Sequence, residues 1–185
     1  ESSRNPLDPS PLIAEGRTPI FLIRHGQTAW NVQRRFLGKS DIPLDEVGQI
    51  QACELAERLS SLSLQHIYSS PLARARQTAE TVARSQSGRL VKMVQDLAEL
   101  DQGELEGQKG DQLPTAYPAF FAAWAQDPAH IRVPGGETLH ECQTRAWKAL
   151  HWILDDTPKG QPVAIFSHKM VICSIFCHLL DLPLR

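Results

Sequence analysis

The chain has 185 residues, 42% of them hydrophobic and 22% charged, and its formal net charge is −2. This length favours one domain with a hydrophobic core of its own. The balanced charge and the lack of a basic block argue against a nucleic-acid-binding protein. No apolar run approaches the roughly 20 residues that cross a bilayer, and the N-terminus carries no signal pattern, so we expect a cytoplasmic protein that does not bind membranes.

The cysteines are too few and too scattered to form an obvious site. They do not form a C-x-x-C pair, and two of them have the spacing of one helix face: Cys53, Cys142, Cys173 and Cys177. We interpret all four as reduced core residues rather than as disulfides or metal ligands.

The N-terminal part of the chain divides into an arm and a domain. Residues 1–18 contain prolines and polar residues without periodicity, which predicts an extended arm, and residues 19–185 are predicted to form the folded domain. The first strand, over about 19–24, is an apolar run that stops at Arg24 and His25. A buried parallel strand that ends in polar residues places them at the carboxyl edge of the sheet, where open α/β folds bind ligands.

A basic loop follows over residues 31–43 and contains Arg34, Arg35 and Lys39. Its composition fits a solvated loop and a ligand-facing loop equally well. From Asp45 onward, apolar residues at helical spacing predict a helix with an inner face of Val47, Ile50, Leu55, Leu59 and Leu62.

The next predicted strand covers residues 66–69. Ser70 and Pro71 follow it with the pattern of an N-cap and a first helical position, which predicts a helix over residues 71–85. Arg74 would then lie in the first turn of this helix, where backbone N–H groups attract anions.

A third strand is predicted at 90–94, followed by an acidic loop over 96–107 that is punctuated by glycines. Residues 112–126 are predicted to form a helical cover over the body. Their aromatic stripe is interpreted as core rather than as a cofactor site: Tyr117, Phe120, Phe121 and Trp124.

The C-terminal part repeats the arrangement of the first strand. Thr138 and Glu141 have the spacing of a capping box, and the helix after them would bury Leu139, Cys142, Ala146, Leu150 and Ile153. The last strand, over residues 161–166, is closely followed by His168, and a final apolar helix is predicted over 171–180.

Strands that alternate with helices predict βαβ units and a mainly parallel sheet. Because parallel strands end at one edge, His25 and His168 would lie together there, beside Arg24 and Arg74. Arginine forks match phosphate oxygens, and a helix N-terminus favours an anion. The sequence therefore predicts a site for a phosphoryl group.

The residue types also suggest a chemistry. A neutral imidazole held in one tautomer is a competent nucleophile toward phosphorus. The guanidiniums would neutralise charge in the transition state, so we expect no metal and no cofactor. The leaving oxygen needs a proton, and the acidic loop over 96–106 is where we expect the acid.

Several segments, in this order, resemble the histidine phosphatase superfamily, in its phosphoglycerate-mutase-like branch. The resemblance covers roughly residues 19–180 and rests on Arg24-His25-Gly26-Gln27-Thr28-x-x-Asn31, Asp41-x-Pro43-Leu44-Asp45-x-x-Gly48-x-x-Gln51-Ala52, Ser69-Ser70-Pro71-Leu72-x-Arg74-Ala75-x-Gln77-Thr78-Ala79, Pro134-Gly135-Gly136-Glu137 and Ser167-His168. It implies a three-layer α/β/α sandwich with a mainly parallel central sheet.

The resemblance also implies roles for single residues. His25 would be the nucleophile that forms a phosphohistidine, and Glu99 would be the proton donor. The second catalytic histidine and the other pocket residues would be His168, Arg24, Arg74, Asn31 and Gln27. The other carboxylates of the acidic loop remain alternatives to Glu99, namely Asp96, Asp101, Glu104 and Glu106.

We predict a metal-independent phosphomonoester hydrolase that acts on a small phosphorylated metabolite. The alternatives are a cofactor-dependent phosphoglycerate mutase and a non-catalytic relative that binds a phosphorylated ligand. A phosphatase is favoured because Gln27 stands where mutases usually have Glu, and because no paired-arginine cover segment is found between Arg74 and Gly135. The oligomeric state is left open, with a homodimer as one option.

Two further features concern the substrate. Arg34, Arg35 and Lys39 suggest that the substrate carries a second acidic group. Lys169 stands where the family usually has Gly or Asn, and either adds a cation to the pocket or simply begins the last helix.

Overall fold

A computed structural model of the chain describes residues 7–184, apart from the side chain of Leu12. Its centre is a four-stranded sheet in the order β1-β4-β2-β3, and all the strand pairings are parallel. The strands are β1 (Ile20–Arg24), β2 (His66–Ser69), β3 (Val91–Met93) and β4 (Val163–Ser167). The predicted parallel sheet is confirmed.

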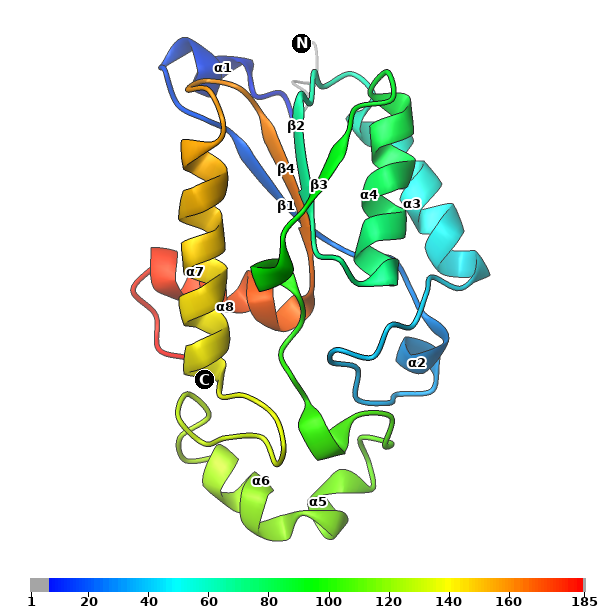
Figure 1. Ribbon diagram of the computed structural model, residues 1–185, viewed down its shortest axis with the longest axis vertical. Helices are drawn as coiled ribbons and strands as arrows, with labels where there is room; N and C mark the ends of the chain where they lie inside the picture. The colour runs from blue at the N-terminus through cyan, green and yellow to red at the C-terminus, as the bar shows by residue number, and fades with distance from the viewer. Residues whose placement is uncertain (1–6, 185) are drawn as a thin grey trace, which may run out of the picture.

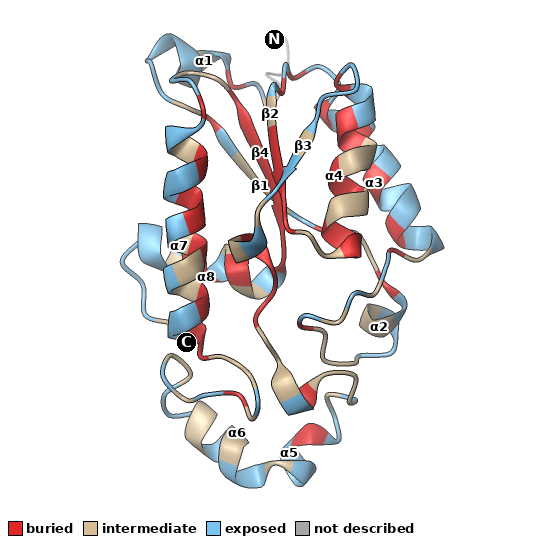
Figure 2. Cartoon of the chain, viewed as in Figure 1, coloured by how far each residue is buried: buried red, intermediate tan, exposed pale blue. Residues whose placement is uncertain are grey.

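Helices cover both faces of this sheet, as Figure 1 shows. On one face, α3 (Glu46–Leu59) packs on α4 (Ala73–Ser85), and on the other, α7 (Leu139–Asp155) packs on α8 (Lys169–Leu179). The fold is therefore the predicted three-layer α/β/α sandwich. Buried residues line the inward sides of α4 and α7 and fill the central strand β4 (Figure 2), as expected for a parallel strand covered on both faces.

The strand register sets which side chains meet at the carboxyl edge of the sheet. Arg24 of β1 pairs with Ser167 of β4, and Ser69 of β2 pairs with Phe166 of the same strand. The residues that follow these strands therefore emerge side by side. Shorter helices lie beyond this edge in Figure 1: α2 (Ala29–Val32), α5 (Leu113–Ala116) and α6 (Pro118–Trp124).

The inner face predicted for α3 is partly wrong. Val47 and Ile50 are 48% and 59% exposed, and the buried face consists of small residues together with Leu59: Gly48, Ala52 and Ala56. Small side chains allow the two helices to approach closely. A Cβ at Gly48 would also clash with the backbone of Gln27, so the N-terminus of α3 packs directly on the loop after β1.

The predicted start of α4 is also corrected. The helix begins at Ala73, and its first turn is capped by Asp41, whose carboxylate accepts a 2.5 Å hydrogen bond from the Ala73 N–H. Ser70 instead contacts His168. The extended backbone of Leu72, with φ −64° and ψ 133°, separates Ser70 from the helix.

The helical cover predicted over residues 112–126 is two helices rather than one. They meet at Tyr117, whose φ of −128° and ψ of 56° are not helical. Proline disfavours helical backbone at the residue before it, and Pro118 therefore ends α5 and begins α6. Between β3 and α5, the acidic loop contains two 3₁₀ turns, Gln95–Leu97 and Gly103–Leu105.

Two smaller expectations are also revised. A short helix, α1 (Ser10–Ala14), lies within the segment predicted as an extended arm, and residues 1–6 of that arm lie outside the described residues. All four cysteines are free, but Cys53 and Cys173 are exposed and only Cys142 is buried. Within residues 7–184, no helix has the length and hydropathy needed to cross a membrane.

Candidate active site

The imidazole of His25 lies at the end of β1 and is 8% exposed. Its Nδ1 lies 2.7 Å from the Gly26 carbonyl oxygen. A carbonyl can only accept, so Nδ1 carries the hydrogen and Nε2 keeps its lone pair. Burial lowers the pKa of His25 to about 3, and the nearby guanidiniums of Arg74 and Arg24 also lower it. At neutral pH the ring is therefore uncharged and its Nε2 is nucleophilic.

His168 follows β4 and faces His25, with the ring centroids 5.2 Å apart and the planes tilted by 55°. Its Nε2 lies 2.8 Å from Ser70 Oγ. Ser70 Oγ also accepts from the Leu72 N–H at 3.3 Å, so its own hydrogen can be donated to His168. With that hydrogen donated to Nε2, we assign the ring hydrogen of His168 to Nδ1. Burial, followed by the charge of Arg74, lowers the pKa of His168, so this ring is also neutral.

Arg74 is completely buried. Its Nη1 donates to the Ser40 carbonyl at 2.9 Å and its Nη2 donates to the Gly38 carbonyl at 2.7 Å. Burial lowers the pKa of Arg74 to about 10, which still leaves the guanidinium charged at neutral pH. Glu106 fixes the same loop, because its carboxylate accepts from the Lys39 N–H and from the backbone and hydroxyl of Ser40.

Two buried nitrogen atoms have no hydrogen-bond partner among the described residues: Arg74 Nε and His168 Nδ1. Leaving a buried donor unpaired costs about 1–3 kcal/mol, and more when the group is charged. Both nitrogens belong to side chains that interact with His25. The charge of Arg74 lowers the pKa of His25, and the ring of His168 faces the His25 ring. Such a pair of unpaired donors is the expected binding site for the oxygens of an anion.

Glu99 is the acidic-loop carboxylate that lines the cavity over this site. It is 6% exposed, and it accepts backbone hydrogen bonds from Leu100 at 2.9 Å and Met170 at 3.4 Å. Burial is the largest effect on this group and raises the pKa of Glu99. The carboxyl group can therefore hold a proton closer to neutral pH than an exposed glutamate does.

The other acidic-loop carboxylates are engaged elsewhere or exposed. Asp101 forms an ion pair with Lys39 at 2.9 Å, Glu106 holds the loop at residues 39–40, and Glu104 is exposed. The side chain of Asp96 does not line the cavity. This geometry favours Glu99 over its four neighbours as the acid of the site.

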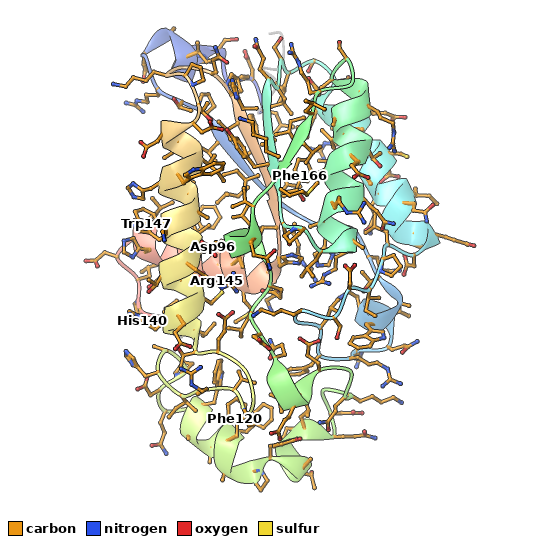
Figure 3. All side chains as sticks on the ribbon, viewed as in Figure 1. Asp96, Phe120, His140, Arg145, Trp147 and Phe166 are labelled. Atoms are coloured by element: carbon orange, nitrogen blue, oxygen red, sulfur yellow. The ribbon has the colours of Figure 1, made fainter. Side chains whose placement is uncertain are left out.

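Arg145 of α7 fixes the segment that carries Glu99, and Figure 3 shows it beside Asp96. Its Nη1 donates to the carbonyls of Asp96 and Ala98 at 2.8 and 2.6 Å, and its Nη2 donates to the Glu99 carbonyl at 3.0 Å. The same guanidinium forms a 2.5 Å ion pair with Glu137. A single side chain therefore ties the backbone on both sides of Ala98 to α7.

The remaining predicted site residues lie around the entrance. Arg24 and Asn31 line both the cavity over the site and an adjoining one of about 180 Å³, which His25 and Gln27 also line. The Asn31 Oδ1 accepts from the N–H and the hydroxyl of Thr28. The Gln27 amide nitrogen donates to Asp45 at 3.1 Å, so Gln27 is placed on the rim rather than between the histidines.

The cavity over the site has a volume of about 370 Å³. One wall is aromatic, and its other residues include Arg24, Arg35 and Lys169. The aromatic residues predicted as core do pack against the main hydrophobic core. Three of them are half-buried and also line the cavity: Phe120, Phe121 and Trp124. Phe120 lies on α6 (Figure 3), and the centroid of its ring is 5.3 Å from that of the Trp124 ring.

The comparison with known families gives a clear result. The family model described as "Histidine phosphatase superfamily (branch 1)" matches residues 20–185. The chain belongs to the histidine phosphatase superfamily. It is thus an enzyme of the histidine phosphatase type, as its resemblance to that family implied.

The names of individual relatives of this histidine phosphatase mention different activities. The "Probable phosphoglycerate mutase GpmB" of Salmonella choleraesuis is 36% identical over 164 residues, which cover 89% of this chain and 75% of the relative. Bacillus stearothermophilus YhfR superposes with a TM-score of 0.82 at 36% identity, covering 90% and 82% of the two chains. A mycobacterial glucosyl-3-phosphoglycerate phosphatase with VO3 gives 0.79 at 31% identity, covering 88% and 81%.

An alpha-ribazole phosphatase of Shigella flexneri is similar in fold as well, with a TM-score of 0.80 at 27% identity and coverage of 89% and 80%. The named relatives therefore include phosphatases and a probable mutase. Membership of the superfamily gives the type of enzyme, and the substrate has to be argued from this chain's own cavity.

Sequence reasoning missed the supporting roles of three residues at the site of this histidine phosphatase. Arg145, Glu106 and Ser70 hold backbone segments or a ring in place, and their partners are far away in sequence. A lone arginine on an amphipathic helix gives no local signal of such a role. Among residues 7–184, no group of three or more His, Cys, Asp or Glu side chains is placed to hold a metal ion.

Proposed function

We propose that this histidine phosphatase hydrolyses phosphomonoesters of small metabolites through a phosphohistidine on His25, without a metal ion. The observation that carries the proposal is the pair of unpartnered buried donors, Arg74 Nε and His168 Nδ1, next to the His25 ring. These donors suit the oxygens of a phosphoryl group, and the neutral His25 suits attack on its phosphorus.

In the first step, His25 Nε2 attacks phosphorus and the bond between phosphorus and the ester oxygen breaks. The hydrogen bond from Nδ1 to the Gly26 carbonyl stabilises the positive charge that develops on the ring. Arg74, Arg24 and His168 bind the phosphoryl oxygens. Glu99, whose burial favours the protonated form, gives its proton to the leaving alkoxide.

In the second step, the ionised Glu99 removes a proton from water, and the water oxygen attacks phosphorus. The nitrogen–phosphorus bond breaks, and inorganic phosphate and neutral His25 are released. Glu99 is protonated again, so one residue serves as acid and then as base. The cavity over the site leaves room for that water once the alcohol has departed.

A phosphoglycerate mutase is the second candidate, because the GpmB relatives are named as probable mutases. A mutase has to keep water from the phosphohistidine and hold a bisphosphate, which calls for extra cations in the cover. The basic residues between residues 103 and 134 do not line the cavity: Lys109, His130 and Arg132. Arg132 instead pairs with Glu141. This arrangement favours hydrolysis.

The decisive experiment measures phosphate release from a panel of monoesters in the presence of a chelator. We expect release by the wild-type protein, none by His25→Ala, and unchanged release by His140→Ala, which alters an exposed histidine. Rapid quenching in alkali followed by mass spectrometry should locate the phosphoryl group on His25. Isomerisation of a phosphoglycerate without phosphate release would favour the mutase, and phosphate binding without turnover would favour the non-catalytic relative.

A further inference from the structure

The site contains more cationic side chains than are needed to bind one phosphoryl group. Arg24, Arg35 and Lys169 line the cavity over the site, where the single lining carboxylate is Glu99. Arg74 does not line this cavity and is completely buried. Within the described part of the chain, none of these four cations is within ion-pair distance of a carboxylate. This concentration of positive charge is local, because the whole chain has a formal net charge of −2.

The four cations divide into two pairs by position. Arg74 and Arg24 act electrostatically on His25, where they lower the pKa of the nucleophile. They are the pair expected to bind the phosphoryl group itself. Arg35 and Lys169 line the larger cavity, which shares Arg24 and Asn31 with the smaller cavity at His25. A second pair of cations in the cavity is suited to a second anion.

The two outer cations come from different segments of the chain. Arg35 Nη1 donates to the Gly107 carbonyl at 2.5 Å and Nε donates to Gln33 at 2.7 Å, so this guanidinium is fixed by neutral partners. Lys169 is the first residue of α8 and directly follows His168. The structure thus resolves the two interpretations of Lys169, because it both begins the helix and lines the cavity.

The other lining residues and the volume of the cavity indicate what the body of the ligand is like. Phe36, Phe120, Phe121 and Trp124 form an apolar part of the cavity lining, and aromatic side chains favour contact with a flat or apolar body. A volume of about 370 Å³ lies at the small end of the range for small-molecule sites. This volume suits a metabolite rather than a phosphorylated protein segment.

We infer that Arg35 and Lys169 form a second anion subsite, and that the substrate is a phosphomonoester whose apolar or ring-containing body carries a second anionic group. This inference rests on the proposed phosphatase activity and adds the substrate class. The basic loop predicted to bind such a group contributes Arg35 alone. Arg34 lies outside the cavity lining, and Lys39 is paired with Asp101.

The test compares two esters that differ by one charge, phenyl phosphate and 4-carboxyphenyl phosphate. We expect Lys169→Gln and Arg35→Gln each to lower kcat/KM for the carboxylated ester by roughly tenfold, the size of one charge-assisted hydrogen bond. The loss should appear mainly in KM, because the subsite binds ground state and transition state equally. Turnover of phenyl phosphate should change by less than about twofold. Arg34→Gln removes a neighbouring charge outside the cavity and should affect neither ester.

Equal losses on both esters would overturn the subsite, because the two cations would then act on the phosphoryl group. Equal effects of Arg34→Gln and Arg35→Gln would overturn it too, since a diffuse field would explain them. Hydrolysis of phenyl phosphate that depends on His25, together with unchanged discrimination in the variants, would leave the proposed function standing and refute the inference alone.

The absence of turnover on any ester would refute the proposed function instead. Equilibrium binding of the two esters to His25→Ala, with and without Lys169→Gln, then tests the subsite on its own. Tighter binding of the carboxylated ester that is lost with Lys169→Gln would support it. Equal binding of the two esters would overturn it.

Discussion

The rings of His25 and His168 lie 5.2 Å apart, centroid to centroid, at the carboxyl edge of the sheet. They meet because Arg24 and Ser167, the residues before them, are register partners in the adjacent parallel strands β1 and β4. Both rings are neutral by virtue of burial and nearby guanidiniums. Two uncharged imidazoles can therefore lie side by side without repulsion, and in the proposed mechanism one is the nucleophile and the other donates to a phosphoryl oxygen.

Arg74→Lys should abolish the anion site while retaining a positive charge. Lysine cannot reproduce the planar fork that serves the Gly38 and Ser40 carbonyls and leaves Nε free for a ligand. We expect kcat/KM to fall by roughly a hundredfold or more. Inorganic phosphate should raise the Tm of the wild-type protein but not that of the variant. Arg76→Lys on the same helix, which alters an exposed ion pair with Glu80, should behave as wild type.

Glu99→Gln should slow hydrolysis according to the leaving group. General acid catalysis contributes roughly 10²–10⁴-fold, and an alkyl alkoxide depends on it far more than a nitrophenolate. We expect kcat/KM to fall by about that factor for an alkyl phosphate, and much less for p-nitrophenyl phosphate. Glu104→Gln is the control in the same loop. A loss that is equal for both esters would contradict the assignment of Glu99 as the acid.

Arg145→Gln should impair the role of Glu99 indirectly, through the backbone segment that carries it. The variant loses the donors to Asp96, Ala98 and Glu99 and leaves Glu137 without its ion-pair partner. Because this pair is only partly buried, its loss should cost less than the roughly 3–5 kcal/mol found for fully buried pairs. We expect the same preference for good leaving groups as in Glu99→Gln, with partial rescue by Arg145→Lys. A stability loss without any leaving-group effect would reduce Arg145 to a structural role.

The lowered pKa of His25 predicts a stability change with pH. In the unfolded chain the ring takes up a proton near pH 6.5, whereas in the folded protein it stays neutral down to about pH 3. The unfolded state therefore binds more protons within this window, and the free energy of unfolding falls as pH drops through it. Denaturant titrations of wild type and His25→Gln at several pH values isolate this group. The stability of the variant relative to wild type should rise from pH 7.5 to pH 5.

Local patterns were sufficient wherever a short segment determines its own structure. The Thr138–Glu141 capping box forms as predicted, and the apolar runs that end in His25 and His168 are the strands β1 and β4. The turn at Tyr117 was also encoded locally, by Pro118. Hydrophobic spacing alone did not reveal it, because spacing takes no account of the backbone limits that proline imposes on its neighbour.

Local sequence patterns failed where packing against another segment decides which residues are buried and what a side chain contacts. Val47 and Ile50 have helical spacing but face solvent, because α3 packs through its small residues. Ser70 has the sequence of an N-cap, yet its hydroxyl contacts His168, which follows β4. The same holds for the basic loop, in which Arg35 lines the cavity and Arg34 does not.

The sequence by itself determined the α/β architecture and which side chains stand at the ends of the first and last strands. Periodicity, capping and strand termination are local properties, so they can be read along the chain. Only the tertiary structure decided which carboxylate reaches the cavity and which nitrogens have no hydrogen-bond partner. It also decided how Arg145 holds the loop that carries Glu99. Those properties depend on distances and burial between segments far apart in sequence, which no local pattern specifies.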